Sequence, residues 1–279
     1  MDLKDKTILI TGSTDGVGCV VAQRLGAAGA RLLVHGRDAT RGKAIVAEIE
    51  AAGGIAEFFA ADLASLAEVR RLAEAVRART DQLDILINNA GIGTAGAKRQ
   101  VSADGYELRF AVNYLAGFLL TSELLPLLKA SAPARIVNVA SAGQQAIDFG
   151  DVMLTHGYSG VRAYCQSKLA QILFTVDLAE ELEGTGVTVN ALHPASYMDT
   201  TMVRQAGVTP WSSVETGADA IVNLAASPAL EGRSGLYFDG LRESRADAQA
   251  YDAKARQRLR GLSLDLIGPA SPKSKEQHS

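Results

Sequence analysis

Few residues of this chain are suited to hold a metal ion or a disulfide, and neither sign of charge dominates. Its 279 residues include two cysteines, Cys19 and Cys165, and neither has a neighbour at metal-ligand spacing. We therefore predict no metal site and no disulfide framework. The formal net charge of −3 gives no broad basic surface of the kind that binds nucleic acid. The composition favours a small-molecule ligand over a nucleic acid.

A secretion signal and an uninterrupted membrane span are also missing. Residues 1–6 are charged, and no apolar segment of a signal peptide follows them. The apolar run of residues 115–128 is interrupted by the polar residues 121–123 and by Pro126, which argues against a helix that crosses a bilayer. We expect a soluble, cytoplasmic protein.

Short apolar runs alternate with helical patterns along the chain, and no Pro/Gly-rich linker or repeat interrupts them. Hydrophobic residues make up 47% of the sequence, enough for a sizeable core. This alternation is typical of an α/β protein with a doubly wound parallel sheet flanked by helices. We predict about seven strands in a single domain, at residues 7–10, 31–35, 55–60, 83–87, 134–141, 187–192 and 235–238. We also predict a last helix from about residue 244 to 262 and a disordered tail at 269–279.

A glycine-rich loop follows the first apolar run and leads directly into a helical pattern. A strand, a tight loop and a helix start in succession turn backbone N–H groups and the positive helix end toward an anion. This predicts a dinucleotide pyrophosphate site, although an ordinary turn between a strand and a helix also uses glycine. No Lys-Ser/Thr pair follows the loop, so it is not a Walker-type loop. The loop consists of Gly12, Ser13, Thr14, Asp15, Gly16, Val17 and Gly18.

The end of the second predicted strand carries Gly36 and Arg37, where NAD-binding folds usually have an acidic residue for the ribose 2′-hydroxyl. A guanidinium can bind a 2′-phosphate through two hydrogen bonds, so this position favours NADP. A solvated loop arginine is the alternative. The next residue, Asp38, is placed to cap the following helix.

Tyr164 and Lys168 are four residues apart in a run of helix formers. In a helix their side chains leave the same face, and an ammonium beside a tyrosine favours the phenolate and lowers the phenol pKa. With the charge of an oxidised nicotinamide, this pair could form an acid/base catalyst. The same spacing also occurs by chance on helix surfaces.

Taken together, the motifs resemble those of the short-chain dehydrogenase/reductase family in order and spacing. They are Thr11-Gly-x-x-x-Gly-x-Gly18, Asn88-Asn-Ala-Gly91, Asn113, Ser141, Tyr164-x-x-x-Lys168 and His193-Pro194, and they span nearly the whole chain. The segment between Ser141 and Tyr164 is longer than in the typical member and closer to the retinol-dehydrogenase-like branch. The resemblance implies a Rossmann-type fold in residues 1–268.

The resemblance also implies roles for individual residues. Tyr164 would be the general acid/base, Ser141 would polarise the substrate carbonyl, Lys168 would lower the tyrosine pKa and hold the nicotinamide ribose, and Asn113 would hold a water beside the lysine. Alanine replaces the family's usual glycine after Pro194, which leaves Thr201 as a rival to Thr200. The implied cofactor contacts are the glycine-rich loop, Arg37, Asp62, Leu63, Asn89, Ala90, Gly91, Tyr164, Lys168, Pro194, Ser196 and Thr200.

Two segments rich in large apolar residues, about 142–163 and 196–212, suggest a lid over a lipophilic substrate. Packing on each other or on a partner is the alternative. We predict an NADP(H)-dependent oxidoreductase that interconverts a carbonyl and an alcohol. A non-catalytic dinucleotide-binding regulator and a sugar-nucleotide epimerase or dehydratase are the competing readings. The short chain after residue 238 speaks against the latter.

The segment from Val112 to Leu128 and the helix that carries Tyr164 are apolar nearly all round. A helix on one face of a sheet needs only one apolar stripe, so the excess predicts burial against a second subunit. In the family these two helices commonly form a dimer interface. We therefore predict a homodimer or homotetramer.

Overall fold

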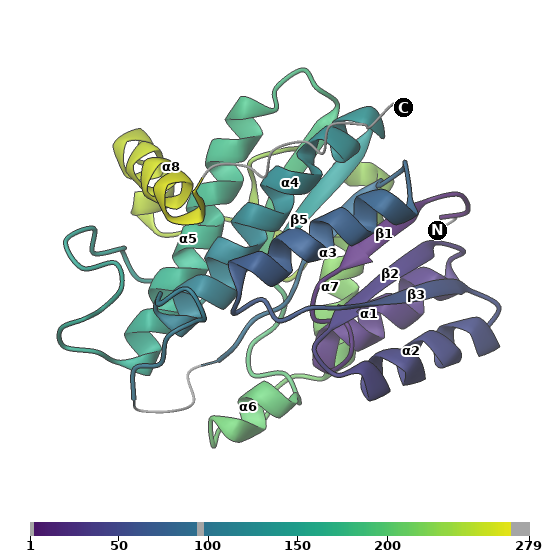
Figure 1. Ribbon diagram of the computed structural model, residues 1–279, viewed down its shortest axis with the longest axis horizontal. Coiled ribbons are helices and arrows are strands. Elements are labelled where there is room, and N and C mark those ends of the chain that lie inside the picture. Colours follow the sequence, from purple (N-terminus) through teal and green to yellow (C-terminus); the bar gives the residue numbers. More distant parts are fainter. Residues whose placement is uncertain (1–2, 94–97, 269–279) are drawn as a thin grey trace, which may run out of the picture.

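Eight strands form one sheet in the order β3-β2-β1-β4-β5-β6-β7-β8 in the computed structural model, which describes residues 3–93 and 98–268 (Figure 1). Strands β1 to β7 are parallel, and β8 pairs antiparallel with β7. The order reverses between β1 and β4, which makes the sheet doubly wound as predicted. The strands are β1 (Thr7–Ile10), β2 (Arg31–Gly36), β3 (Ile55–Ala60), β4 (Ile85–Asn88), β5 (Ala134–Val139), β6 (Val187–His193), β7 (Tyr237–Asp239) and β8 (Arg242–Ser244).

Helices cover both faces of the sheet, so its central strands are continuously apolar and buried. One apolar cluster joins the sheet to α1, α2 and α7, and the other joins it to α3, α4, α5 and α8 (Figure 1). The helices are α1 (Gly16–Ala27), α2 (Ala39–Ala51), α3 (Leu66–Arg79), α4 (Ala116–Ala130), α5 (Gly160–Glu181), α6 (Thr201–Gln205), α7 (Val214–Ala226) and α8 (Ala253–Ile267), with short turns η1 (Phe110–Leu115), η2 (Pro228–Leu230) and η3 (Ala248–Tyr251).

The end of the chain differs from the prediction. Residues 242–244 form the polar edge strand β8, so the sheet has eight strands rather than about seven. This strand was not predicted because its sequence contains no apolar run. Helix α8 begins only at residue 253, where the Asp252 side chain accepts a hydrogen bond from the Lys254 amide at 2.9 Å. Gly268, with a φ of 66°, ends it. The predicted tail at 269–279 lies outside the described residues.

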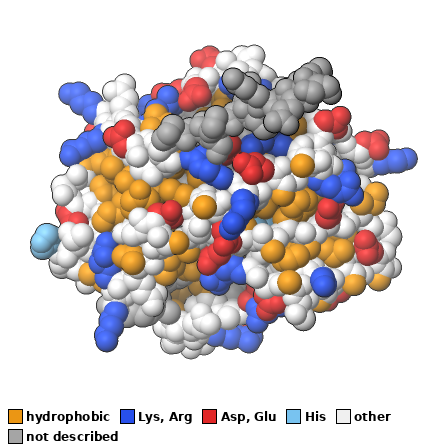
Figure 2. Space-filling view, in the orientation of Figure 1, with side chains coloured by type: hydrophobic (Ala, Val, Ile, Leu, Met, Phe, Trp, Pro, Cys, Tyr) orange, Lys and Arg blue, Asp and Glu red, His pale blue; other side chains and the backbone are white. Residues whose placement is uncertain are grey.

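Helix α8 packs against α5 and reaches η1. Arg260 donates to Asp177 at 2.6 Å, and the Tyr114 hydroxyl lies 2.6 Å from Ser263 Oγ. The apolar face of α5 is therefore buried within one chain. This packing accounts for the excess of apolar residues that suggested a second subunit. Hydrophobic side chains still reach the surface of this side (Figure 2), and the homo-oligomer stays a prediction.

The segment Phe110–Ala130, made of η1 and α4, is long and apolar enough to cross a membrane by length and composition alone. However, 61% of its most apolar window is buried inside the fold. Contact with the sheet, α3 and α5 therefore explains its composition.

Leu259→Ala should destabilise the protein by about 2–5 kcal/mol, the usual cost of emptying a buried leucine site. Leu259 is 1% exposed and belongs to the cluster under α8, whereas Leu264 on the same helix is 52% exposed. Leu264→Ala is therefore the matched control, expected to change the free energy of unfolding by less than about 0.5 kcal/mol. Urea denaturation of both variants measures the difference. Equal losses would mean that α8 is not docked as described.

Candidate active site

The predicted motifs meet at the carboxyl edge of the sheet, beside the point where the strand order reverses. The glycine-rich loop follows β1, Asn89 to Gly91 follow β4, Ser141 follows β5 and Pro194 follows β6. Helix α5 brings Tyr164 and Lys168 to the same edge. Parallel α/β sheets bind their ligands at this edge.

The glycine-rich loop is held against the end of β4. Asn89 Nδ2 donates to the carbonyls of Thr11 and Gly12 at 2.9 and 3.0 Å. A Cβ on Gly12, whose φ is 65°, would lie 2.8 Å from Ala90 Cα, and one on Gly18 would lie 2.3 Å from the Gly12 carbonyl oxygen. Only glycine allows this close approach of the two segments, which leaves a backbone cradle suited to a pyrophosphate.

His35, a residue that the sequence analysis did not single out, supports the same loop from below. Its Nδ1 accepts from the Gly12 amide at 3.1 Å, so Nε2 carries the proton and donates to the Ala61 carbonyl at 3.2 Å. Burial lowers the pKa of His35 to about 4, and the ring is neutral at physiological pH. The Ser13 hydroxyl donates to the Ile10 carbonyl at 2.8 Å. The Ser13 amide donates to the His35 carbonyl at 2.9 Å, so both the side chain and the N–H of Ser13 serve to build the loop.

At the end of β2, the acid of an NAD-type site would require the Thr14 side chain to move. A Cβ at Gly36 would lie 2.5 Å from Thr14 Oγ1. Arg37 follows it and is exposed, and Asp38 caps α2 as predicted, accepting from the Thr40 amide at 2.9 Å. No carboxylate at position 36 therefore neutralises the positive charge of Arg37.

Arg41 is a second cation beside the loop that the sequence analysis missed. Its guanidinium lies 3.2 Å from Asp15 and 3.7 Å from Asp38. Asp15 thereby links α2 to the start of α1, where its side chain also accepts from the Gly16 amide at 2.7 Å. The position of Arg41 one helical turn after Arg37 is the signal that could have identified it.

Ser141 is fixed by its backbone and keeps its hydroxyl for the site. Tyr237 and Gln144 donate to its carbonyl at 3.1 and 3.0 Å. Its Oγ accepts from the Gly143 amide at 3.0 Å, and its hydroxyl lies close enough to Tyr164 to lower the pKa of that phenol. The hydrogen bond from the Gly143 amide uses a lone pair of Oγ, so the hydroxyl hydrogen of Ser141 can still be donated. Polarising a carbonyl requires such a donor.

Tyr164 is a neutral phenol in this structure. Burial raises its pKa above the ordinary value, and the hydrogen bond with Ser141 opposes that shift. Lys168 Nζ lies 5.9 Å from the centre of the ring. The predicted fall of the tyrosine pKa is therefore absent from the chain alone, because burial is the largest influence on this pKa and raises it. A protonated Tyr164 suits proton donation to a developing alkoxide.

Lys168 is buried and held by two neutral acceptors. Its Nζ donates to the Val139 carbonyl at 2.8 Å and to Gln171 Oε1 at 2.9 Å. Burial lowers its pKa to about 7. A Cβ on Gly91 would lie 3.4 Å from Nζ, so the glycine leaves the ammonium reachable from the strand edge.

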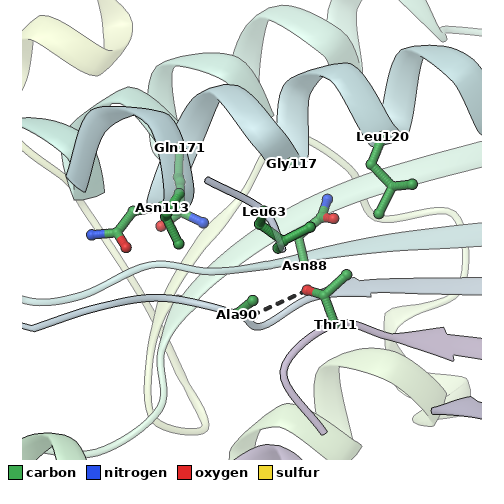
Figure 3. A pocket seen from close by; sticks show the side chains of 9 residues that line it. Thr11, Leu63, Asn88, Ala90, Asn113, Gly117, Leu120 and Gln171 are labelled. Atoms are coloured by element: carbon green, nitrogen blue, oxygen red, sulfur yellow. Dashed lines mark hydrogen bonds between the residues drawn. The ribbon is translucent and has the colours of Figure 1, made fainter. Parts of the chain in front are cut away.

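Asn113 lies in η1, one turn of π-helix, and ties the loop after β4 to α5. Its Oδ1 accepts from the Ile92 amide at 2.7 Å, and its Nδ2 donates to Ser167 Oγ at 2.9 Å. Figure 3 shows its side chain near Gln171, beside a small cavity above Asn88. The side chain thus ties the backbone of Ile92 to α5, and its Nδ2 also donates to the Ile92 carbonyl at 3.1 Å.

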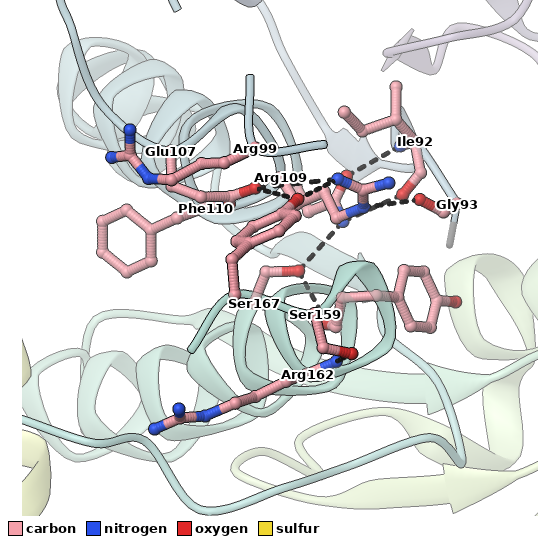
Figure 4. A network of polar contacts seen from close by, with 12 residues as sticks. Ile92, Gly93, Arg99, Glu107, Arg109, Phe110, Ser159, Arg162 and Ser167 are labelled. Carbon is pink, nitrogen blue, oxygen red and sulfur yellow. Dashed lines mark hydrogen bonds and ion pairs between the residues drawn. The ribbon is translucent and has the colours of Figure 1, made fainter. Parts of the chain in front are cut away.

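A buried polar network not expected from the sequence anchors the segment between Ser141 and Tyr164 (Figure 4). Arg109 donates to the Gly93 carbonyl at 2.7 Å and to the Tyr158 hydroxyl at 2.5 Å, and Tyr158 donates to Glu107 at 3.1 Å. The network joins the start of η1, the loop after β4 and the 142–163 segment. Charged residues directly before an apolar helix were the available signal.

The segment after β6 crosses the front of the glycine-rich loop. Thr200 caps α6 and approaches Gly16, where a Cβ would lie 3.4 Å from its methyl group. Thr201 donates to Asp15 at 3.0 Å. Both rival threonines therefore lie at the loop, Thr200 by contact and Thr201 by a hydrogen bond. Ser196 hydrogen-bonds His193 at 3.1 Å.

An exposed aromatic pair stands on this segment. Tyr197 and Trp211 are 46% and 75% exposed, and their rings meet edge to face at 4.9 Å. Tyr197 lies close enough to Tyr164 to affect its pKa. The pair therefore borders the entrance to the catalytic side chains.

Comparison with known proteins gives matches over most of the chain. A family model described as short chain dehydrogenase matches residues 6–210. Human retinol dehydrogenase 13 is 37% identical over 98% of this chain and 87% of its own length. A structure of an uncharacterised protein from Mycobacterium paratuberculosis has a TM-score of 0.78 at 29% identity and covers 95% of this chain and 94% of that chain. The RhlG/NADP complex of Pseudomonas aeruginosa has a TM-score of 0.71 at 31% identity and covers 85% and 95%.

Proposed function

The chain belongs to the short-chain dehydrogenase/reductase family, in its retinol-dehydrogenase-like branch, and on that premise we propose an NADP(H)-dependent oxidoreductase. It interconverts a carbonyl and an alcohol on a fairly apolar small molecule. The observation that carries the proposal is the meeting of Ser141, Tyr164 and Lys168 beside the glycine-rich loop. A polarising hydroxyl, a proton donor and a buried lysine at one sheet edge suit carbonyl reduction.

The residues divide the work as follows. Ser141 donates a hydrogen bond to the substrate oxygen as negative charge develops there. Tyr164, beside Ser141, donates a proton to the same oxygen in reduction and receives it in oxidation. Lys168 would favour the phenolate form of Tyr164 and would bind the ribose of the cofactor. A bound nicotinamide would supply or accept the hydride.

NADP is proposed over NAD because of the residues after β2. The close approach of Gly36 to Thr14 disfavours an acid at this position, and Arg37 and Arg41 supply positive charge near it. Neighbouring structures are described with bound NADP, including RhlG and the ketoreductase LanV. The glycine contacts that hold the loop against β4 fit a dinucleotide backbone.

An apolar substrate is proposed from the segments at 142–163 and 196–212. Met202 packs directly on Gly93, because a Cβ on this glycine would lie 2.6 Å from Met202 Cγ. Tyr197 and Trp211 expose aromatic surface at the entrance. The relatives named retinol dehydrogenases point the same way, since retinol is an apolar alcohol. We infer that these segments act as the lid.

The test is a screen of apolar aldehydes, ketones and alcohols with NADPH and NADP, followed at the nicotinamide absorbance. We expect turnover of at least one apolar carbonyl compound, and NADH in place of NADPH should support less. A chain that binds NADP but turns over no member of the panel would favour the non-catalytic regulator instead.

A further inference from the structure

Gln171 lies one helical turn beyond Lys168 on α5 and is 4% exposed. Its Oε1 accepts from Lys168 Nζ at 2.9 Å, and the Val139 carbonyl accepts from the same nitrogen at 2.8 Å. An ammonium has three N–H donors. The two acceptors take two of them and leave one for a ligand at the strand edge.

The surroundings of Lys168 give it little other help to carry a charge. Among the described residues, no carboxylate forms an ion pair or a hydrogen bond with Nζ. The titratable groups that face it are Tyr164 on α5 and His193 at the end of β6, and burial lowers the pKa of His193 so that its ring is neutral. Asp239 on β7 acts on His193. The charged form of Lys168 therefore depends on two neutral oxygens.

The cavity beside Gln171 has no charged lining either. Its side chain, Asn113 and Asn88 line a space of about 10 Å³, close to the volume of one water (Figure 3). Asn88 connects onward through Asn138 to Thr175 by hydrogen bonds of 2.9 and 2.8 Å, and Thr175 donates to the Gln171 carbonyl at 2.8 Å. This network fixes the turn of α5 that carries Gln171.

We propose that Gln171 is a positioning residue of the reaction, whose amide oxygen holds the Lys168 ammonium in place beneath Tyr164. The inference rests on the proposed function. Gln166 on the same helix is equally buried, and neither of its side-chain polar atoms has a partner among the described residues. Burial on α5 therefore does not by itself give a glutamine a hydrogen-bond partner, and the bond from Lys168 distinguishes Gln171.

The test compares Gln171→Met, Gln171→Glu and Gln171→Asn. Methionine keeps the side-chain volume but is a poor hydrogen-bond acceptor, so the charged form of Lys168 loses a stabilising contact. The alkaline limb of the kcat/KM profile, where Lys168 loses its proton, should therefore move down by about one pH unit or more. Glutamate adds a charge and should move the limb up by about one to three units. Asparagine keeps the amide but is too short, and should behave like methionine. Gln166→Met is the matched control and should move nothing.

A second measurement does not depend on turnover. Titration of 13Cε-labelled lysines by NMR in the cofactor-free protein, with the Lys168 signal assigned from Lys168→Met, should show the same opposite shifts. Shifts of Lys168 in one direction for both Met and Glu, or none, would overturn the proposal, as would NMR shifts with no movement of the pH profile. If the wild-type protein turns over no carbonyl substrate, the proposed function fails, and the lysine titration still decides whether Gln171 holds the ammonium.

Discussion

Replacing Tyr164 by phenylalanine is expected to lower turnover by about two orders of magnitude or more and to leave cofactor affinity nearly unchanged. Burial raises the pKa of the Tyr164 phenol, so the hydroxyl beside Ser141 keeps its proton until it is transferred. Its removal leaves the developing alkoxide without an acid, while the ring still fills its place. Steady-state rates and a fluorescence titration of NADPH measure the two effects.

Tyr106→Phe is the matched control for this substitution. The Tyr106 hydroxyl donates to the Leu266 carbonyl near the end of α8 at 2.9 Å, so its loss should leave turnover within about twofold of wild type. A deuterated cofactor establishes whether the chemical step limits the rate. Near wild-type turnover of Tyr164→Phe under a rate-limiting chemical step would remove Tyr164 from its assigned role.

Arg37→Ala is expected to abolish a preference for NADPH over NADH of at least about tenfold in dissociation constant. A charge-assisted hydrogen bond contributes about 1.5–3 kcal/mol, and one such bond to a 2′-phosphate is enough for that ratio. NADH has no phosphate there, so its binding should change little. Titration of both cofactors into both proteins measures the four constants.

Arg41→Ala is the comparison variant, because Arg41 is the second arginine near the end of β2. The Arg41 guanidinium is shared between Asp15 and Asp38 at 3.2 and 3.7 Å, so we expect a smaller loss of NADPH affinity. Equal affinity for both cofactors in the unmutated protein would contradict the NADP assignment. So would a loss of NADH binding in Arg37→Ala as large as the loss of NADPH binding.

The parallel sheet and its functional edge could be predicted because the signals are local. Each central strand is a short apolar run, and glycine, asparagine or serine follows it at the edge where strands of this class end. The helix cap at Asp38 is equally local, and it is confirmed. These features depend on neighbours within a few residues.

The remaining features depend on contacts between distant parts of the chain. In the sequence, His35 is an ordinary strand residue, and only the folded chain shows that it accepts from the Gly12 amide. In the same way, Gln171 is an ordinary polar helix residue, and only the structure shows that it accepts from Lys168. The strand β8 is polar and three residues long, with nothing but its pairing to β7 to define it. Burial of Tyr164, which reverses the direction expected for its pKa, is also a property of the assembled site.

The docking of α8 onto α5 sets the order in which the chain can complete itself during synthesis. Arg260 and Asp177 are 83 residues apart, so at about 5–20 residues per second the ribosome needs several seconds to supply the helix that covers the catalytic one. Throughout that interval the part of α5 that α8 covers in the folded protein is without this cover. The helix that carries Tyr164 is thus complete before the helix that encloses it.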